Sequence, residues 1–312
     1  MVFQRQGNAW DYTRSMIPDL AQLSDHVYYL LGAANTALVV NQKEAVIVDT
    51  GGDKDAGRRL KKACESLQVT PVAILNTHAH ADHYGGNDFL VRNFGLPVYA
   101  PPFEASIIEN PYLEPVYLFG GAKPPAELMS KWLMGKPTEV THILKPGRLE
   151  LIGLDLKIID TSGHAHTHYA LRVGDVLIAA DAVFGSSVLE KYPLPFGQDV
   201  GAQIASAARV GETGARVVLP GHGDPTEDVQ ELAENNLRAF ARATDAVLAA
   251  CTGVGSEAVL GAAADALGLE LRDLPRYYLN LCVVNAYLSY LRETGRVALS
   301  LQDNQLRWER VL

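Results

Sequence analysis

The sequence predicts a mixed α/β (α+β) protein followed by a smaller, mainly helical domain, and three observations carry this prediction. Residues 20–100 alternate short apolar runs with helical stretches. Four apolar runs in the chain each end in a small residue and a side chain of the kind that binds metals. After residue 222 the composition changes to long helical stretches. We therefore expect one domain over residues 1–225 and a second over residues 226–312, a total length that suffices for one large core and a small additional one.

The elements of the first domain follow in order along the chain. We expect strands at residues 27–31, 37–40, 45–48, 72–76 and 98–100, and helices near residues 56–68 and 87–94. Residues 101–147 break this rhythm with clustered prolines, aromatic residues and methionines. Because Gly120, Gly121 and Gly135 supply hinges, we interpret this segment as an inserted lid over the functional site. The alternative is a packed pair of peripheral helices.

The second domain reads as three helices and a β-hairpin. We expect helices near residues 226–251, 256–267 and 277–293, and strands at residues 297–301 and 305–310. This order of elements is similar to that of a winged-helix module. Residues 226–312 contain eight arginines and no lysine against twelve acidic residues, which argues against a nucleic-acid partner. Because the third helix is apolar on most faces, we expect it to be buried within the chain or in a homodimer.

The run Thr77-His78-Ala79-His80-Ala81-Asp82-His83 follows directly after an apolar strand-like segment. It places three histidines and one aspartate within six positions. Side chains alternate in extended backbone, so His78 and His80 face the same way, while Asp82 and His83 enter a turn and can point toward a second ion. A polar loop after a strand is the simpler alternative, but it does not account for this crowding of metal-binding residue types.

Three further apolar runs end in residues of the same kind. His164 follows the first of these runs, with His166 and His168 close behind, and Asp181 and His222 end the other two. Seven of the nine histidines fall in these motifs. The pattern predicts a site built from loops at one edge of a sheet. His26 and His142 are isolated, and we expect them to be structural or exposed. Cys64, Cys251 and Cys282 are scattered, and we expect buried apolar side chains rather than ligands or disulfides.

These motifs, together with Asp49 in the run Ile47-Val48-Asp49-Thr50-Gly51-Gly52, resemble those of the metallo-β-lactamase superfamily. The resemblance is to its H-x-H-x-D-H hydrolase branch, with motifs similar to glyoxalase II. It implies a four-layer αββα sandwich as the catalytic domain. It also implies that His78, His80 and His164 bind a first metal ion, that Asp82, His83 and His222 bind a second, and that Asp181 bridges both. Asp49 and His168 match supporting positions, whereas His166 falls where the family varies.

The chemistry of these residues suits two divalent metal ions, with zinc as the first choice and iron or manganese as alternatives, since no thiolate is offered. Two such ions can share a hydroxide and polarise a substrate oxygen. We therefore expect a hydroxide that bridges the metals to attack the carbonyl of an ester, thioester or lactone. Asp82 and Asp181 are the expected catalytic residues, with Asp82 orienting the hydroxide.

Two alternative functions stay open. One is a mononuclear iron persulfide dioxygenase, which would use His78, His80, His164 and Asp181. The other is a phosphodiesterase of the same superfamily that acts on nucleic acid through the winged tail. Quorum-quenching lactonases carry a tyrosine three residues after the bridging aspartate, where this chain has Phe184. The pattern Asp181-x-x-Phe184 is instead similar to that of hydroxyacylglutathione hydrolases. The basic residues with which those enzymes bind glutathione are not recognisable in this chain.

The composition of the insertion predicts the kind of substrate. Residues 101–147 carry four lysines against five glutamates, so they offer no strong clamp for a polyanion. We expect a small-molecule substrate with an acyl or other apolar portion, selected by Tyr112, Tyr117, Phe119, Trp132 and the nearby methionines. The chain has no apolar run of 18 residues, and its first ten residues lack the layout of a signal peptide. With three unpaired cysteines, these features predict a cytoplasmic protein without a membrane partner.

Overall fold

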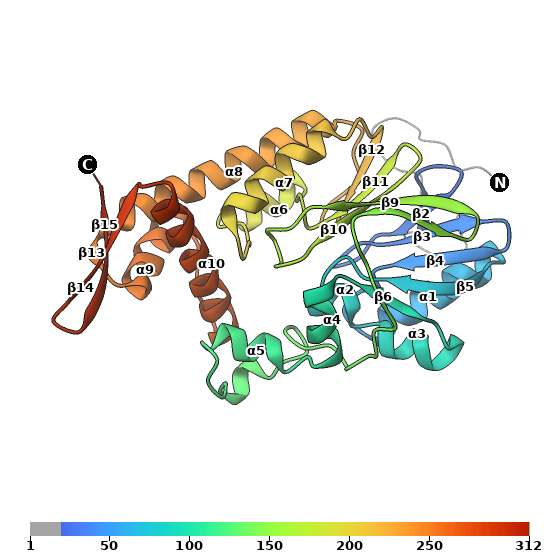
Figure 1. The fold of residues 1–312 in the computed structure, drawn as a ribbon, viewed down its shortest axis with the longest axis horizontal. Coiled ribbons are helices and arrows are strands. Elements are labelled where there is room, and N and C mark those ends of the chain that lie inside the picture. The colour runs from blue at the N-terminus through green and yellow to red at the C-terminus, as the bar shows by residue number, and fades with distance from the viewer. Residues whose placement is uncertain (1–19, 312) are drawn as a thin grey trace.

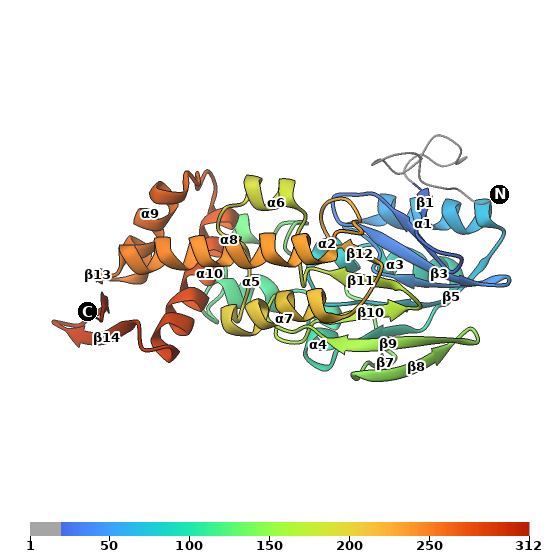
Figure 2. The same ribbon diagram turned by 90° about the horizontal axis from the view of Figure 1, so that it is seen from above.

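The computed structural model describes residues 20–311 and shows two β-sheets face to face with helices on their outer sides (Figures 1 and 2). A mainly helical region continues from one end of this sandwich. The predicted four-layer architecture is therefore confirmed. The first ten residues, on which the signal-peptide argument rests, lie outside the described part of the chain. Between residues 20 and 311, no helix combines the length and apolar character needed to cross a membrane.

The first sheet has seven strands that lie side by side in chain order. They are β1 (Leu20–Gln22), β2 (Val27–Leu30), β3 (Thr36–Asn41), β4 (Glu44–Val48), β5 (Thr70–Leu75), β6 (Val98–Ala100) and β7 (His142–Ile143). Neighbours are antiparallel from β1 to β4 and parallel from β4 to β7. Helices α1 (Lys54–Leu67) and α3 (Asn87–Phe94) cover its outer face. All five strands predicted for residues 20–100 are present, with ends shifted by up to two residues.

The second sheet has the order β12-β11-β10-β9-β8. Its strands are β8 (Gly147–Leu151), β9 (Leu154–Asp160), β10 (Tyr169–Val173), β11 (Val176–Ala180) and β12 (Val217–Pro220). Only β11 and β12 run parallel within this sheet. Helix α7 (Val200–Glu212) and the first half of α8 (Val229–Ala250) cover its outer face.

The alternation of side chains along the strands creates separate cores on the two faces of each sheet. In β4, Val46 and Val48 face the other sheet, whereas Ala45 and Ile47 pack beneath α1 and α3. Leu171 and Ile178 of the second sheet join the core between the sheets. Burial on both faces explains why β5, β11 and β12, which precede three of the predicted metal-binding motifs, read as continuous apolar runs, whereas β9 alternates buried and exposed residues.

The C-terminal region consists of α8, β13 (Thr252–Val254), α9 (Ser256–Leu267), α10 (Leu274–Glu293), β14 (Val297–Gln302) and β15 (Gln305–Arg310). The three helices and the hairpin lie in the predicted order, and β13 adds a third strand that was not predicted. The likeness to a winged helix stays a prediction. Two predicted helix starts were wrong. Thr226 pairs with Val218 in an isolated bridge, so α8 begins only at Val229. Asp273 caps α10 through the backbone N–H of Arg276 at 2.8 Å, and this helix begins at Leu274.

Helix α8 belongs to two cores. Its first half contributes Leu232 to the layer over the second sheet, and its second half contributes Phe240 and Val247 to the C-terminal core. The division between residues 225 and 226 therefore stays a prediction. The homodimer also stays a prediction, although Leu301 and Leu306 lie exposed on the terminal hairpin.

The apolar helix α10 is buried within the chain on two sides. Val283, Val284 and Tyr287 pack into the C-terminal core, against α8 and α9. Nearer the start of the same helix, Tyr278 and Cys282 pack against residues of the insertion, a contact that Figure 1 shows between α10 and α5. Packing against two surfaces accounts for a helix that is apolar on most faces.

The insertion contains α4 (Pro102–Glu109), α5 (Leu113–Leu118) and the short 3-10 helix η1 (Ala126–Leu128). Leu118, Leu128 and Leu133 form its own small core with α10. The segment thus contains short helices, some of which pack against α10. Its action as a lid stays a prediction.

Glu114 on α5 is a carboxyl group buried at this junction, with 4% of its surface exposed. Burial raises the pKa of Glu114 to about 8, and the like charge of Glu104 adds to this rise. An acid whose pKa is raised on folding takes up a proton when the chain folds. The contribution of neutral Glu114 to the free energy of unfolding is therefore present at low pH and declines as the pH rises toward 8.

We predict that Glu114→Gln becomes more stable than the wild type as the pH rises, because the amide keeps the shape and never ionises. Between pH 4.5 and 8 the difference in unfolding free energy should grow by up to about 1.4 kcal/mol per pH unit. Urea unfolding at pH 5, 6.5 and 8 measures this difference. Glu127→Gln on the exposed part of η1 is the control and should show no such trend. A pH-independent difference for Glu114→Gln would contradict the prediction.

Candidate metal centre

The predicted metal-binding residues converge at one edge of the two sheets. The loop after β5 carries His78 and His80, and it leads into the short helix α2 (Ala81–Tyr84), which carries Asp82 and His83. A turn was expected here, but the four residues form one helical turn. Asp181 directly follows β11, His222 follows β12, and His164 lies in the connection from β9 to β10.

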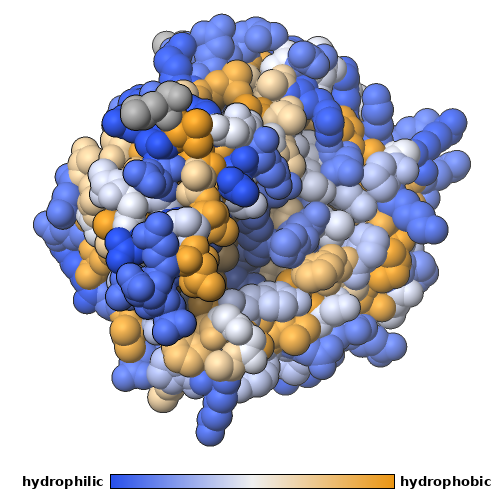
Figure 3. Space-filling view, turned by 60° about the vertical axis from the view of Figure 1, so that its left-hand side comes forward, coloured by the Kyte–Doolittle hydropathy of each residue, from blue (hydrophilic) through white to orange (hydrophobic). Residues whose placement is uncertain are grey.

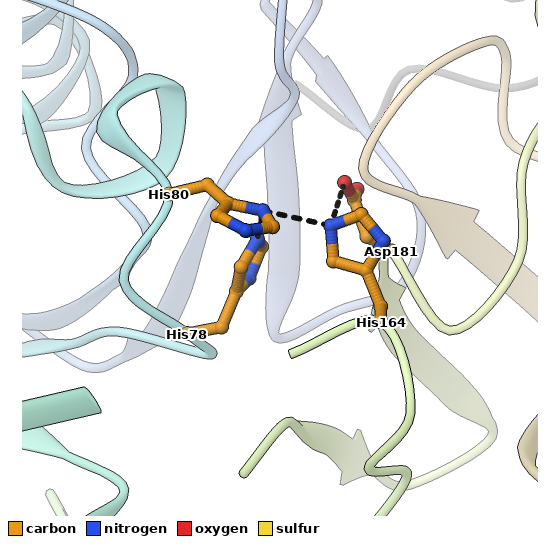
Figure 4. A group of neighbouring side chains, drawn as sticks. All are labelled: His78, His80, His164 and Asp181. Carbon is orange, nitrogen blue, oxygen red and sulfur yellow. Dashed lines mark hydrogen bonds and ion pairs between the residues drawn. The ribbon is translucent and has the colours of Figure 1, made fainter. Parts of the chain in front are cut away.

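The first group of side chains is His78, His80, His164 and Asp181, whose candidate ligand atoms all lie within 4.8 Å of one another. His80 Nδ1 lies 3.0 Å from His78 Nε2 and 2.8 Å from His164 Nε2. His164 Nε2 lies 3.1 Å from Asp181 Oδ2. Figure 4 shows the imidazoles and the carboxylate turned toward a common centre.

The second group is Asp82, His83 and His222, again within 4.8 Å. His222 Nε2 lies 3.3 Å from Asp82 Oδ2. Asp181 reaches this group as well, because its Oδ1 lies 3.4 Å from His83 Nε2 and its Oδ2 lies 3.5 Å from His222 Nε2. The structure therefore brings all seven predicted side chains together and puts Asp181 between the two groups. Their roles as ligands stay predictions.

The donor atoms of this cluster fit metal ions. His80 Nε2, His83 Nε2 and Asp181 Oδ1 are buried and form no hydrogen bond within the described part of the chain, although the last two lie 3.4 Å apart. Buried polar atoms without a partner are costly and rare in folded proteins. Coordination would satisfy them, and a set of imidazole and carboxylate donors suits zinc, iron or manganese.

The charges of the cluster also favour bound cations. Burial alone would raise the pKa of Asp181, but the imidazoles of His222, His83 and His164 hold it well below its ordinary value. Burial and the four neighbouring imidazoles lower the pKa of His78. For His83 the effect of burial is overcome by the carboxylates of Asp181, Asp49 and Asp82, which raise its pKa. The site thus holds buried negative charge that needs positive charge beside it.

Asp49 and His168 lie where the sequence placed supporting residues. Asp49 Oδ1 accepts a hydrogen bond from Thr77 N at 2.8 Å, and its Oδ2 lies 2.8 Å from His83 Nδ1. His168 Nε2 accepts the backbone N–H of Asp181 at 3.2 Å, so its Nδ1 carries the proton and donates to Thr161 Oγ1 at 2.8 Å. Such partners fix the tautomer and direction of the metal-facing groups.

The backbone around Asp181 is shaped to admit its carboxylate. Ala180 adopts a left-handed conformation with φ of 44°, which costs energy for a residue with a side chain. Gly221 approaches so closely that a Cβ there would lie 2.0 Å from Asp181 Oδ1 and 3.0 Å from His83 Cε1. Only glycine fits at position 221 while Asp181 keeps its place.

Several residues that position the site were not predicted. Asn35 Nδ2 donates to the carbonyl oxygens of Pro220 at 3.0 Å and Gly223 at 2.7 Å, and so holds the loop of His222. Gln203 Nε2 donates to Asp181 O at 2.9 Å. Each is a single polar residue outside any motif, so the sequence carries no signal for it.

The remaining histidines lie outside the cluster, as expected. His26 Nδ1 lies 2.9 Å from Val40 O, and His142 stacks on Tyr99 at a centroid distance of 4.3 Å. The exposed ring of His166 lies 4.9 Å from that of Phe103 on α4. The three cysteines are unpaired, and Cys64 and Cys251 are buried.

We predict that Gly221→Ala lowers the metal content of the protein, because the new methyl group displaces the Asp181 carboxylate. The matched control is Gly261→Ala in α9, where nothing lies within 4 Å of the added Cβ and alanine favours the helix by roughly 0.5–1 kcal/mol. Metal analysis and thermal unfolding of both variants test this. Wild-type metal content in Gly221→Ala would contradict the geometry described above.

Relatives and solved structures support the fold and the general class. The probable metallo-hydrolase YybB of Bacillus subtilis is 28% identical over 233 residues, which cover 70% of this chain and 96% of YybB. Hydroxyacylglutathione hydrolase of Nitrosomonas europaea is 30% identical over 150 residues, which cover 47% of this chain and 44% of that enzyme. The second likeness is therefore confined to less than half of either chain.

Two crystal structures resemble nearly the whole chain. The metallo-beta-lactamase family protein TTHA1429 from Thermus thermophilus has a TM-score of 0.70 at 24% identity and covers 93% of this chain and 100% of its own. A beta-lactamase domain protein from Burkholderia ambifaria has a TM-score of 0.70 at 18% identity and covers 96% of each chain. At these identities they show the fold alone, including the C-terminal helices.

The family itself follows from the sequence match together with the geometry of the site. The model of the metallo-beta-lactamase superfamily matches residues 29–222, a span that contains every member of the two groups of side chains described above. This match covers more than half of the chain, and the protein therefore belongs to the metallo-β-lactamase superfamily of metal-dependent hydrolases.

Proposed function

We propose that this protein hydrolyses an ester, thioester or lactone with the help of two metal ions, zinc being the first choice. The observation that carries the proposal is the place of Asp181, whose two oxygens face both ligand groups at 3.1–3.5 Å. When bound, the metal ions would activate water as a nucleophile and polarise the carbonyl oxygen of the substrate. His78, His80 and His164 would hold one ion, Asp82, His83 and His222 the other, and Asp181 both.

Asp82 is the group best placed to orient the attacking water. Its side chain is 40% exposed, in contrast to the buried Asp181, so solvent and substrate can reach it. Burial alone would raise the pKa of Asp82, but His83 and His222 lower it, and the carboxylate stays ionised. We assign the carboxylate of Asp82 to accept a hydrogen bond from the attacking water and so orient it toward the carbonyl of the substrate.

The surroundings of the site suit an acyl group. The ring of Phe196 lies 5.2 Å from those of both His80 and His164, and the ring of Phe184 lies 5.6 Å from that of His164. Phe184 supplies no hydroxyl for the leaving group, unlike the tyrosine of the lactonases. On the insertion, Phe103 lies 6.2 Å from Tyr117 and presents 41% of its surface. These rings favour apolar substrate portions over charged ones.

One face of the molecule is hollowed, and apolar side chains form part of the rim of this hollow (Figure 3). Among the aromatic residues expected to select the substrate, Tyr117 approaches Phe103, and Phe119 contacts Tyr278 of α10 at 5.2 Å. Trp132 is 73% exposed and lies beside Lys131, and Tyr112 is also exposed. We therefore base the test of acyl binding on Phe103 and Tyr117.

We predict two equivalents of transition metal per chain in protein purified without chelator. Asp181→Asn should keep at most one and lose about 100-fold or more of the hydrolytic activity, because an amide cannot bridge two cations. Asp265→Asn on the exposed surface of α9 is the control. Elemental analysis measures the metal, and a screen of thioesters, esters, lactones and phosphodiesters measures the activity.

Three results would contradict this proposal. One is a stoichiometry that stays at one after reconstitution with zinc, manganese or iron. Another is oxygen uptake with glutathione persulfide in the absence of ester hydrolysis, which would point to the dioxygenase. A phosphodiester as the preferred substrate would instead point to the nucleic-acid enzyme.

We predict that Phe103→Ala and Tyr117→Ala raise KM several-fold for long acyl chains and leave short ones unchanged. The reason is the loss of apolar contact, which contributes roughly 25 cal/mol per Å² of buried area. Metal content should stay at the wild-type level. Leu306→Ala, which removes an exposed apolar side chain from the distant hairpin, serves as the control. An unchanged dependence on chain length in both aromatic variants would exclude acyl selection by this surface.

A further inference from the structure

Glu104 on α4 is a buried carboxylate that contacts two separate loops of the metal centre. Only 2% of its surface is exposed. Its Oε2 accepts the backbone N–H of Ala79 at 3.0 Å. Its Oε1 accepts the backbone N–H of Thr167 at 3.1 Å and lies 3.4 Å from Thr167 Oγ1. One side chain of the insertion therefore joins segments that lie far apart in the sequence.

Both amides sit between residues that face the metal site. Ala79 lies between His78 and His80, and Thr167 lies between His164 and its supporting neighbour His168. The two loops meet where His80 Nδ1 approaches His164 Nε2 at 2.8 Å. A link between Ala79 and Thr167 thus fixes how far apart the imidazoles of the first ligand group stand.

We propose that Glu104 is a positioning residue, which sets the spacing of the His78/His80 loop and the His164 loop for metal binding. The inference rests on the proposed metal centre and adds a residue to it. Helix α4 also carries Phe103, whose ring faces Tyr117 and His166. The same helix therefore connects the surface proposed to bind the acyl group with the ligands of the first metal ion.

A second attachment of the insertion supports this connection. The backbone N–H of Gly135, near the end of the insertion, donates to Tyr84 Oη at 2.9 Å. Tyr84 is buried at the end of α2, the helix that carries Asp82 and His83. A Cβ at Gly135 would lie 2.5 Å from the Tyr84 ring, so this contact is close as well. Both ends of the insertion hold segments that bear metal-facing residues.

The two oxygens of Glu104 decide the choice of variant. Both accept backbone N–H groups, and an amide offers only one acceptor oxygen. Glu104→Gln keeps the volume but sets its NH₂ group against one of the two N–H donors. Glu109 on the same helix provides a matched control, because its Oε1 also accepts a backbone N–H, that of Val140 at 3.1 Å, on the exposed side of the insertion.

The test is zinc binding measured by competition with a chelator, together with the absorption spectrum of the cobalt(II) form. We expect Glu104→Gln to weaken the binding of one equivalent by about 10–100-fold and to alter its cobalt spectrum, as outer partners of metal ligands do. Glu109→Gln should bind both equivalents like the wild type. Wild-type affinities in Glu104→Gln, or equal weakening in Glu109→Gln, would overturn the proposal.

Amide hydrogen exchange in the metal-free wild-type protein gives a readout that needs neither a folded variant nor a metal ion. Slow exchange at both Ala79 and Thr167 is expected, since both N–H groups are bonded to a buried carboxylate. Fast exchange at either one would show that the link does not exist. If the wild type bound no metal, the proposed function would fail, and the exchange measurement would still decide whether Glu104 joins the two loops.

Discussion

The burial of the Asp181 carboxylate among imidazoles is the constraint on which this molecule depends. Its backbone N–H is bound by His168 and its carbonyl oxygen by Gln203, while Gly221 leaves room for the carboxylate itself. The preceding residue, Ala180, takes a left-handed conformation at the end of β11. The second sheet and α7 thus place this negative charge where it faces two groups of imidazoles. Such an arrangement is costly unless cations complete it.

The regions outside the sandwich connect to this centre through the insertion. Helix α10 of the C-terminal region packs against α5 and η1, and α4 in turn contacts the loops of His80 and His164 through Glu104. Phe103 on α4 and Tyr117 on α5 lie between these contacts, with their rings 6.2 Å apart. The C-terminal helices therefore support the segment that is proposed to select the substrate. These contacts bury the apolar side chains of α10 against both the insertion and the C-terminal core.

Much of this architecture could be predicted, because the signals are local. The seven residues predicted to bind metal follow apolar strand segments, and strand ends that share a sheet edge bring such residues together. Glu104 could not be found, since an acid in the first turn of a helix ordinarily reads as a favourable charge at the helix N-terminus. The strand β13 could not be predicted, because it has only three residues and a glycine at its centre. The contact of the insertion with α10 could not be predicted either, because it depends on tertiary packing. The predicted start of α8 at Thr226 was wrong, because this residue pairs with Val218 instead of capping the helix.

The proposed function depends on Asp181 joining two metal ions at one site. Diffraction data collected at the absorption edges of zinc, iron and manganese, from crystals of protein purified without chelator, test it most directly. Two anomalous peaks, one beside each group of side chains and both within ligand distance of the Asp181 carboxylate, are the expected result. A single peak among His78, His80 and His164, with Asp82, His83 and His222 free of metal, would contradict the account.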